Sequence, residues 1–304
     1  MLALHTTMSH IPVLLHESIE GLNIHKGGTY VDCTVNRGGH SYEIAKALGK
    51  DGTLICIDLD EVALEEAEKK ISKLKNAPTL HFVHSNFRHL ATLLKELKIT
   101  SVDGVLADLG LSSQELDISG RGFSFRYDEP LLMTFAANPT EDMTTAYDIV
   151  NFWSESTIAD VLYAFADERY ARRIARAIVE ARNEGEIKTT HQLVDAIKYA
   201  VPTTYRHGKT HFATKTFQAL RMAVNDELGS IHDLVAALPH VLKPSGRAAI
   251  ITFHSTEDRI VKQSLRSLDE SLTIINKKAI IPTKEELHNN PRARSAQLRI
   301  AERK

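Results

Sequence analysis

The sequence has few cysteines, no long apolar run and no excess of charge of either sign. Its 304 residues contain two cysteines, Cys33 and Cys56, each among apolar residues, which excludes a disulfide framework and a cysteine-rich zinc site. No stretch approaches the roughly 20 apolar residues of a membrane span, and the N-terminal segment lacks the features of a signal peptide. We therefore expect a cytoplasmic protein that makes no contact with a membrane.

The formal net charge is −2, so any nucleic-acid binding has to come from local basic patches. The 15 histidines are scattered along the chain. His81 and His84 are three apart in a strand-like run, which places them on opposite faces of a strand. No metal site is therefore expected. The length predicts two domains, or one domain that carries a large insertion.

Short apolar runs alternate with helical ones between residues 28 and 110, which is typical of strands and helices that build a parallel sheet. Residues 112–140 have no sustained period and are interpreted as loop, and 141–200 have helical spacing. A long helical run at 213–242 leads to further strand-like runs at 246–255, 272–281 and 294–302. The pattern predicts an α/β doubly wound sheet of about seven strands, with a mostly helical insertion after the fourth. The expected core is 1–111 with 212–304, and the expected insertion is 112–211.

Ligands of doubly wound sheets bind beyond the carboxyl ends of the strands. Gly38 and Gly39 follow the first strand-like run, where glycine allows close approach of backbone to a ligand but also serves any tight turn. Asp58 ends the second run, 20 residues after Gly38, the interval at which a carboxylate reaches the ribose hydroxyls of an adenosine cofactor. Alternatively, one of Asp58 and Asp60 only caps the next helix. Together these residues favour a nucleoside cofactor.

Asp32 argues against a dinucleotide, because it lies inside the loop motif and would repel a pyrophosphate. The G-x-G-x-x-G spacing is also absent. A cationic ligand such as S-adenosyl-L-methionine suits this position better. Asp108 ends the fourth run, where it can hold the methyl acceptor, and His254 ends the fifth, where it is either functional or satisfied within the core.

Taken together, the motifs resemble one family, the bacterial 16S ribosomal RNA cytosine-N4 methyltransferases of the MraW type. The matches occur in order along almost the whole chain. They are HIPVLL (10–15), GGHS (38–41), DGVLADLGLSS (103–113), RGFSF (121–125), TFQALR (216–221), VNDEL (224–228), FHS (253–255), EDRIVK (257–262) and NPRARS (290–295).

The resemblance implies a Rossmann-like seven-stranded S-adenosyl-L-methionine-dependent methyltransferase core and a helical substrate-recognition insertion. It implies methylation of the exocyclic amine of a cytidine in the decoding region of 16S rRNA, with the 30S subunit as partner. Asp108 is the candidate catalytic residue, accepting a hydrogen bond from the amine, although it could equally hold the cofactor. The cofactor contacts that the resemblance implies are Gly38, Gly39, His40, Asp58, Phe87, Asp108 and Glu115.

Local clusters of arginine are the candidates for RNA binding, since such charges hold phosphates without reading sequence. Phe123 and Phe125 could stack on a flipped base, or simply pack within the loop. The arginines of 169–176 could instead form a solvated face paired with Asp167, Glu168 and Glu180. The residues expected to contact RNA are Arg121, Phe123, Arg172, Arg173, Arg176, Arg292 and Arg294, with Arg126, Arg169 and Arg299 as further phosphate contacts.

The chain departs from the family pattern at Asn36, where the family has glycine, and at Glu115, Leu132 and Thr134. Asparagine is the residue other than glycine that best tolerates a positive φ, so the turn is expected to survive. Two rival functions remain. One is a non-catalytic or altered-specificity RNA-binding assembly factor with the same fold, which the departures leave open. The other is a nicotinamide-dependent oxidoreductase.

Overall fold

The computed structural model describes residues 12–110, 119–136, 139–140 and 142–304. The chain divides into two compact units. Unit 1 comprises Met1–Gly110 and Gly229–Lys304, and unit 2 comprises Leu111–Leu228. Unit 1 is thus discontinuous in sequence. Among the described residues, no helix combines the length and the apolar character needed to cross a membrane.

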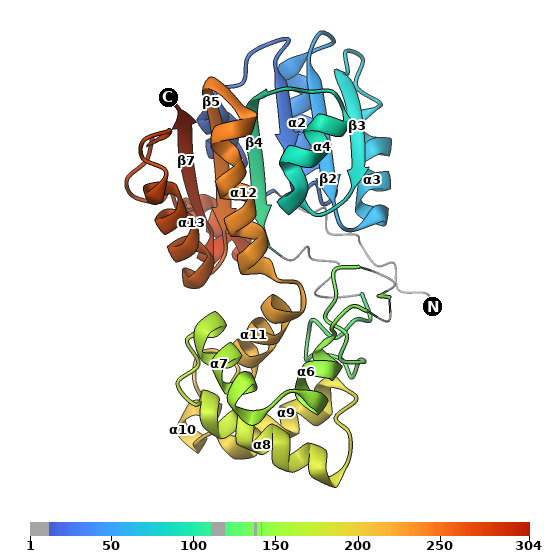
Figure 1. Ribbon diagram of the computed structural model, residues 1–304, viewed down its shortest axis with the longest axis vertical. Helices are drawn as coiled ribbons and strands as arrows, with labels where there is room; N and C mark the ends of the chain where they lie inside the picture. Colours follow the sequence, from blue (N-terminus) through green and yellow to red (C-terminus); the bar gives the residue numbers. More distant parts are fainter. Residues whose placement is uncertain (1–11, 111–118, 137–138, 141) are drawn as a thin grey trace. The chain divides into compact units, whose positions relative to one another are not determined.

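Unit 1 contains a seven-stranded sheet in the order β3-β2-β1-β4-β5-β7-β6, with helices on both faces (Figure 1). The first five strands in this order are parallel, and β7 runs antiparallel to both β5 and β6. The predicted parallel α/β sheet with a helical segment after the fourth strand is confirmed. The strands are β1 Thr29–Asp32, β2 Thr53–Asp58, β3 Thr79–His84, β4 Val102–Leu109, β5 Leu242–Thr252, β6 Leu272–Ile274 and β7 Gln297–Arg303.

The core of unit 1 lies where helices cover the sheet. Leu54 and Cys56 of β2 are fully buried, and Ile44 and Leu48 of the helix after β1 pack in the same cluster. Strands covered on both faces need apolar side chains on both, which explains the continuous apolar runs of the sequence. The helices are α1 Leu15–Leu22, α2 Gly39–Leu48, α3 Glu61–Ile71, α4 Leu90–Glu96, α12 Glu227–Val241, α13 Ser255–Ser267 and α14 Lys284–Asn289, with short 3₁₀ turns at Phe87–His89 and Pro291–Ser295.

Strand β6 is much shorter than the expected run of 272–281. The side chain of Asn276 replaces backbone in the ladder: its Oδ1 accepts from Ile300 N at 2.7 Å, and its Nδ2 donates to Leu298 O at 2.8 Å. The strand therefore ends at Ile274, and further on an isolated bridge pairs Ile280 with Leu298.

Unit 2 is helical around a core of its own. Two of its helices begin with capping boxes, at Thr145 and at Thr189. The unit extends to Leu228, beyond the expected residue 211, because α11 packs against α7 and adds Phe217 to the core. The helices among its described residues are α6 Ala146–Phe152, α7 Glu155–Ala166, α8 Ala171–Glu184, α9 Thr190–Ala200, α10 Thr203–Arg206 and α11 Thr214–Val224.

Candidate functional site

The candidate site lies at the carboxyl ends of β1, β2 and β4. Strand β1 is flanked by β2 on one side and β4 on the other, so the strand order reverses there. Such a switch point is where ligands of open α/β sheets bind. Asp32 is the last residue of β1, Asp58 the last of β2, and Asp108 the penultimate residue of β4. The sheet thus brings together the three strand-end acids that the sequence singled out.

The loop after β1 is a tight turn built by two left-handed residues. Asn36 has a φ of 49° and Gly38 a φ of 66°, so the expectation that asparagine preserves this turn is confirmed. A Cβ on Gly38 would lie 2.9 Å from Cβ of Ala67, and one on Gly39 would lie 2.4 Å from Cγ of Pro12. The glycine pair is therefore required by packing within unit 1.

Asp32 is fully buried beneath this loop. Its Oδ2 accepts a hydrogen bond from the Ser41 hydroxyl, and its Oδ1 accepts from Thr34 N at 3.2 Å. Burial raises the pKa of Asp32 to about 6, and these hydrogen bonds oppose that rise. The sequence motif included Ser41, but its role in holding Asp32 is visible only in the structure.

Asp58 ties the loop to the end of β2. Its Oδ2 accepts from Asn36 N at 2.8 Å, and its Oδ1 accepts from Asp60 N at 3.0 Å. The backbone N–H of Leu59 also interacts with this carboxylate. A carboxylate has about four acceptor positions, so capacity remains for a hydroxyl donor. Burial raises the pKa of Asp58. The adjoining Asp60 caps α3 by accepting from Val62 N and Ala63 N, which confirms that one acid of the pair is a helix cap.

Asp108 is the acid with an unsatisfied oxygen. It is 5% exposed, and its Oδ1 is buried with no hydrogen-bond partner among the described residues. Its backbone N–H donates to Thr34 Oγ1 at 2.6 Å, and its Oδ2 lies 3.7 Å from Nδ1 of His40. Nε2 of the same histidine is 3.0 Å from Val13 O, so it is the nitrogen that carries a hydrogen.

The pKa of Asp108 is raised to about 8, mainly by burial and further by the negative charges of Asp32 and Glu257. At neutral pH this carboxyl is therefore mostly protonated in the free protein. A cation or an N–H donor placed beside Oδ1 would stabilise the carboxylate and satisfy the free oxygen.

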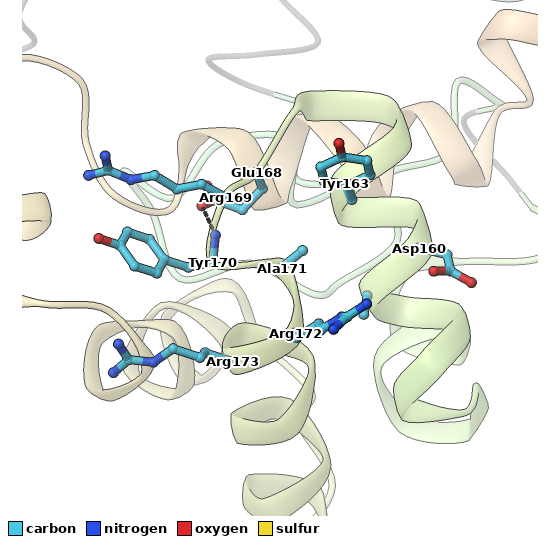
Figure 2. A pocket seen from close by; sticks show the side chains of 9 residues that line it. Asp160, Tyr163, Glu168, Arg169, Tyr170, Ala171, Arg172 and Arg173 are labelled. Carbon is cyan, nitrogen blue, oxygen red and sulfur yellow. Dashed lines mark hydrogen bonds between the residues drawn. The ribbon is translucent and has the colours of Figure 1, made fainter.

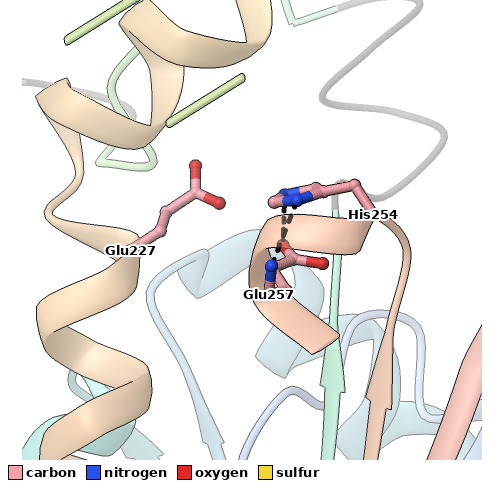
Figure 3. A group of neighbouring side chains, drawn as sticks. All are labelled: Glu227, His254 and Glu257. Atoms are coloured by element: carbon pink, nitrogen blue, oxygen red, sulfur yellow. Dashed lines mark hydrogen bonds and ion pairs between the residues drawn. The ribbon is translucent and has the colours of Figure 1, made fainter. Parts of the chain in front are cut away.

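His254 and Glu257 form a local pair at the start of α13 (Figure 3). His254 Nδ1 accepts from Glu257 N at 3.3 Å, and its Nε2 lies 2.9 Å from Glu257 Oε1. Glu257 Oε2 in turn accepts from Phe253 N at 2.8 Å. His254 therefore caps α13 through Nδ1. Its Nε2 lies close to Glu257 Oε1 but is buried without a hydrogen bond among the described residues, so the choice between a functional and a core histidine stays open.

Phe87 follows β3, the strand beside β2, and is half-buried. The turn that carries it is fixed by Asn86, whose side chain accepts from Arg88 N, and by the ion pair of Arg88 with Asp233 at 2.7 Å. Its position at the carboxyl side of the sheet is compatible with the expected cofactor contact. Glu115, the other expected contact, lies outside the described residues.

Two of the expected RNA contacts have structural roles instead. The guanidinium of Arg121 is buried and donates to Thr134 O at 2.9 Å and to Phe135 O. It also lies 5.2 Å from the ring centroid of Phe123, which is buried and stacks on Phe135. Arg121 and Phe123 thus hold the loop of unit 2 together, and their side chains are buried in it rather than exposed at its surface. Charged residues are normally exposed, so the sequence alone could not reveal this.

The other arginines divide between exposed and paired. Arg299 is buried in β7 and forms a two-point ion pair with Asp258 at 2.6 and 2.8 Å, which corrects its expected role. Arg292 and Arg294 are exposed in the turn before β7. On α8, the exposed arginines are Arg172, Arg173 and Arg176, of which Arg176 lies 3.7 Å from Glu155 Oε1.

The alternative of a solvated face paired with Asp167, Glu168 and Glu180 does not account for Arg172 and Arg173. Glu168 is fully buried, accepting from Tyr170 N and from the Tyr205 hydroxyl, and so does not neutralise the arginines at the surface. Neither Arg172 nor Arg173 forms an ion pair with a carboxylate in the described part of the chain. The apolar side of α8, with Ile174 and Ile178 buried, is as expected.

Comparison with known proteins gives one consistent result. A sequence model of the MraW methylase family matches residues 7–304. The ribosomal RNA small subunit methyltransferase H of Brevibacillus brevis is 44% identical to this chain, over 98% of this chain and 99% of its own length. The protein of the same name from Thermosipho africanus is 46% identical, over 97% of each chain.

Proposed function

The chain belongs to the MraW methylase family, and from that premise we propose that it transfers the methyl group of S-adenosyl-L-methionine to ribosomal RNA. The proposed acceptor is the N4 amine of a cytidine in the decoding region of 16S rRNA, within the 30S subunit. Full-length similarity to small subunit methyltransferases supports the substrate class. The observation that carries the proposal is the cluster of Asp32, Asp58 and Asp108 at the switch point, with one buried carboxylate oxygen unsatisfied.

The cluster fits the proposed cofactor better than a dinucleotide. Burial raises the pKa of all three carboxyls, and repulsion from neighbouring carboxylates adds to this. A pyrophosphate would increase that repulsion, whereas a ligand with a sulfonium and an ammonium group would relieve it. The remaining acceptor capacity of Asp58 suits a ribose hydroxyl. When bound, S-adenosyl-L-methionine would supply the electrophilic methyl group.

Asp108 is the proposed catalytic residue. The amine of cytidine is a poor nucleophile because its lone pair is delocalised into the ring. A carboxylate oxygen that accepts a hydrogen bond from the N–H returns electron density to nitrogen, and Asp108 Oδ1 has its acceptor positions free among the described residues. Thr34 holds the backbone of Asp108, while His40 lies against its other oxygen. These contacts fix the direction of the acceptor before substrate binds.

The exposed arginines supply the proposed affinity for RNA. Arg172, Arg173 and Arg176 on α8 would contact phosphates, as would Arg292 and Arg294 in the turn before β7. Such contacts give affinity that is independent of sequence. Selection of one cytidine then depends on how well that base reaches Asp108.

The test is methyl transfer to purified 30S particles that lack the modification, followed by mass spectrometry of the rRNA. The parent chain is expected to produce one N4-methylated cytidine in 16S rRNA. Asp108→Asn should lower the rate by about a hundredfold or more, the range for loss of a group that assists proton transfer. Asp269→Asn, an exposed carboxylate of unit 1, is the matched control and should keep parent activity.

Binding of the cofactor and of 30S particles without any methylation would contradict the enzymatic function. It would favour the assembly factor, for which the departures at Asn36, Leu132 and Thr134 are the motivation. Methylation of a base other than cytidine would support the methyltransferase function and refute only the proposed acceptor.

A further inference from the structure

A pocket of about 380 Å³ opens in unit 2 where α7 is followed by α8 (Figure 2). Its volume lies within the range of about 300–1,000 Å³ that small-molecule sites occupy. Three arginines line it, namely Arg169, Arg172 and Arg173. The tyrosines Tyr163 and Tyr170 line it as well. This combination of guanidinium groups and aromatic rings suits a ligand that has both negative charge and a flat face.

The charge of the pocket is positive. Its two acids are Asp160, which is exposed, and Glu168, which is buried. Both oxygens of Glu168 are used internally, by Tyr170 N at 2.8 Å and by the Tyr205 hydroxyl at 2.6 Å. Among the described residues, the three arginines make no ion pair with either acid. Their guanidinium hydrogens are therefore available to an anion.

Two of the arginines are held in place by tyrosine rings. The guanidinium of Arg169 lies 4.8 Å from the ring centroid of Tyr170 and 4.9 Å from that of Tyr205. The guanidinium of Arg173 lies 5.7 Å from the Tyr170 ring, and Figure 2 shows Arg169, Tyr170 and Arg173 extending in the same direction. Because these cations are already ordered by cation–π contacts, binding an anion there costs less entropy.

Tyr163 offers the flat face. Its side chain is 66% exposed, and it has no aromatic or cationic partner among the described residues. It stands on α7, the helix toward which the side chain of Arg172 points in Figure 2. A large, exposed and unpaired ring in the same pocket as an unpaired guanidinium is an arrangement in which a nucleobase can stack while its phosphate is held.

We propose that this pocket binds one nucleotide of single-stranded RNA, with its base stacked on Tyr163 and its phosphate held by the adjoining arginines. The inference rests on the proposed function, and it adds that the RNA reaching unit 2 is unpaired. In a duplex each base face is covered by its neighbours, so Tyr163 would find no partner. An acidic peptide would satisfy the arginines but leave the ring without a stacking partner, which disfavours a protein ligand.

The test measures binding of the full chain to a fluorescently labelled single-stranded RNA oligonucleotide, and to the same strand annealed to its complement. Tyr163→Ala should weaken binding to the single strand about fivefold or more, because base–aromatic stacking contributes at least that much. Tyr163→Phe retains the ring and should bind like the parent. Tyr199→Ala removes a tyrosine of unit 2 that is 78% exposed and outside the pocket, and should have no effect.

Two further measurements, binding to the duplex and binding by an Arg172 variant, distinguish the contribution of stacking from that of charge. Tyr163→Ala should leave duplex affinity unchanged, and it should not alter the salt dependence on either RNA. Arg172→Gln should weaken binding and reduce the salt slope by about 0.7 on the single strand if one phosphate is no longer neutralised. Thermal unfolding of each variant verifies that the fold is intact.

Parent-like binding of Tyr163→Ala to the single strand would overturn the inference. So would an equal loss on single strand and duplex, which would reveal an effect of charge or folding. A loss on 30S particles without a loss on protein-free RNA would overturn it in favour of a protein contact. Because the readout is binding, a parent that binds single strands through Tyr163 but never methylates 30S particles would refute the proposed function and leave the pocket standing.

Discussion

Binding of S-adenosyl-L-methionine should release protons from Asp108. The raised pKa of about 8 leaves this carboxyl protonated in about nine tenths of free molecules at pH 7. Asp32, with a pKa of about 6, is protonated in only about one tenth. A cation beside the cluster lowers both pKa values. We therefore expect about 0.9 proton from Asp108 per cofactor bound at pH 7, and about 0.1 from Asp32.

The same ionisation sets how affinity changes with pH. If the cation binds only the ionised Asp108, affinity rises about tenfold per pH unit well below the pKa and levels off above it. Between pH 6 and pH 8 the ionised fraction of a group with a pKa of about 8 grows about fiftyfold. The corresponding gain in binding free energy is about 2 kcal/mol. Asp108→Asn has the same shape but cannot ionise, so this part of the pH dependence should disappear.

Calorimetry at pH 7, in two buffers with different heats of ionisation, measures the released protons directly. The readout is the difference between the parent and Asp108→Asn, because any ionisation of the cofactor itself contributes equally to both. Asp269→Asn should behave like the parent. If the parent and Asp108→Asn released the same number of protons, the cofactor would not rely on the charge of Asp108, and the reasoning would be refuted.

Three further predictions concern the loop and the arginines. Asp58→Ala should weaken binding of S-adenosyl-L-methionine and its demethylated product about ten- to a hundredfold by calorimetry, because charge-assisted hydrogen bonds to the ribose are removed; unchanged binding would exclude the ribose role. Neutralising Arg172, Arg173 and Arg176 together should weaken RNA binding and flatten its salt dependence by up to about 0.9 on a duplex for each phosphate that is no longer neutralised, whereas a parent-like slope would mean a merely solvated face. Asn36→Gly should tighten cofactor binding severalfold if the side chain crowds the methionine end of the cofactor, whereas the strain of its positive φ, on the order of 1 kcal/mol, is already present in the free protein and affects stability. Its side chain donates to Thr34 O at 3.4 Å within the loop, so weaker binding would instead reveal a direct contact with the cofactor.

The stability of the free protein gives an independent check on Asp108. In the unfolded chain this carboxyl has its ordinary pKa of 3.8, and in the folded chain about 8. The folded form therefore binds the extra proton between these values. The stability of the parent relative to Asp108→Asn should fall as pH rises across this window, by up to about 1.4 kcal/mol per unit, and level off above pH 8. Chemical denaturation at several pH values measures this difference. If the stability of the parent and that of Asp108→Asn changed equally with pH, the raised pKa of Asp108 would be contradicted.

The alternation of elements in the core was predictable because burial on both faces forces continuous apolar runs in β1, β2 and β4. The position of β7 between β5 and β6 could not be predicted, since pairing between strands that are distant in sequence leaves no local pattern. The break between α11 and α12 was likewise hidden. Asn225 ends α11 by binding Phe135 N and Met133 O, groups about ninety residues away.

In the site, the strand-end acids could be predicted because the ends of parallel strands meet at one edge. The unsatisfied oxygen of Asp108 could not be predicted, because hydrogen bonding of a side chain depends on the groups that surround it in space. The same limit applies to Arg121, whose partners are main-chain carbonyls that no side-chain motif reveals.

The discontinuity of unit 1 has a consequence for the order in which the chain acquires its structure. Strands β4 and β5 are neighbours in the sheet, yet all of unit 2 lies between Leu109 and Leu242. Closing so long a flexible segment carries an entropy cost of about 4 kcal/mol in its length-dependent part. Unit 2 is continuous and has its own core, so it can fold as soon as it has been synthesised and shorten the segment to be closed. We expect unit 2 to be protected from proteolysis before the β4–β5 pairing forms, during refolding as during synthesis.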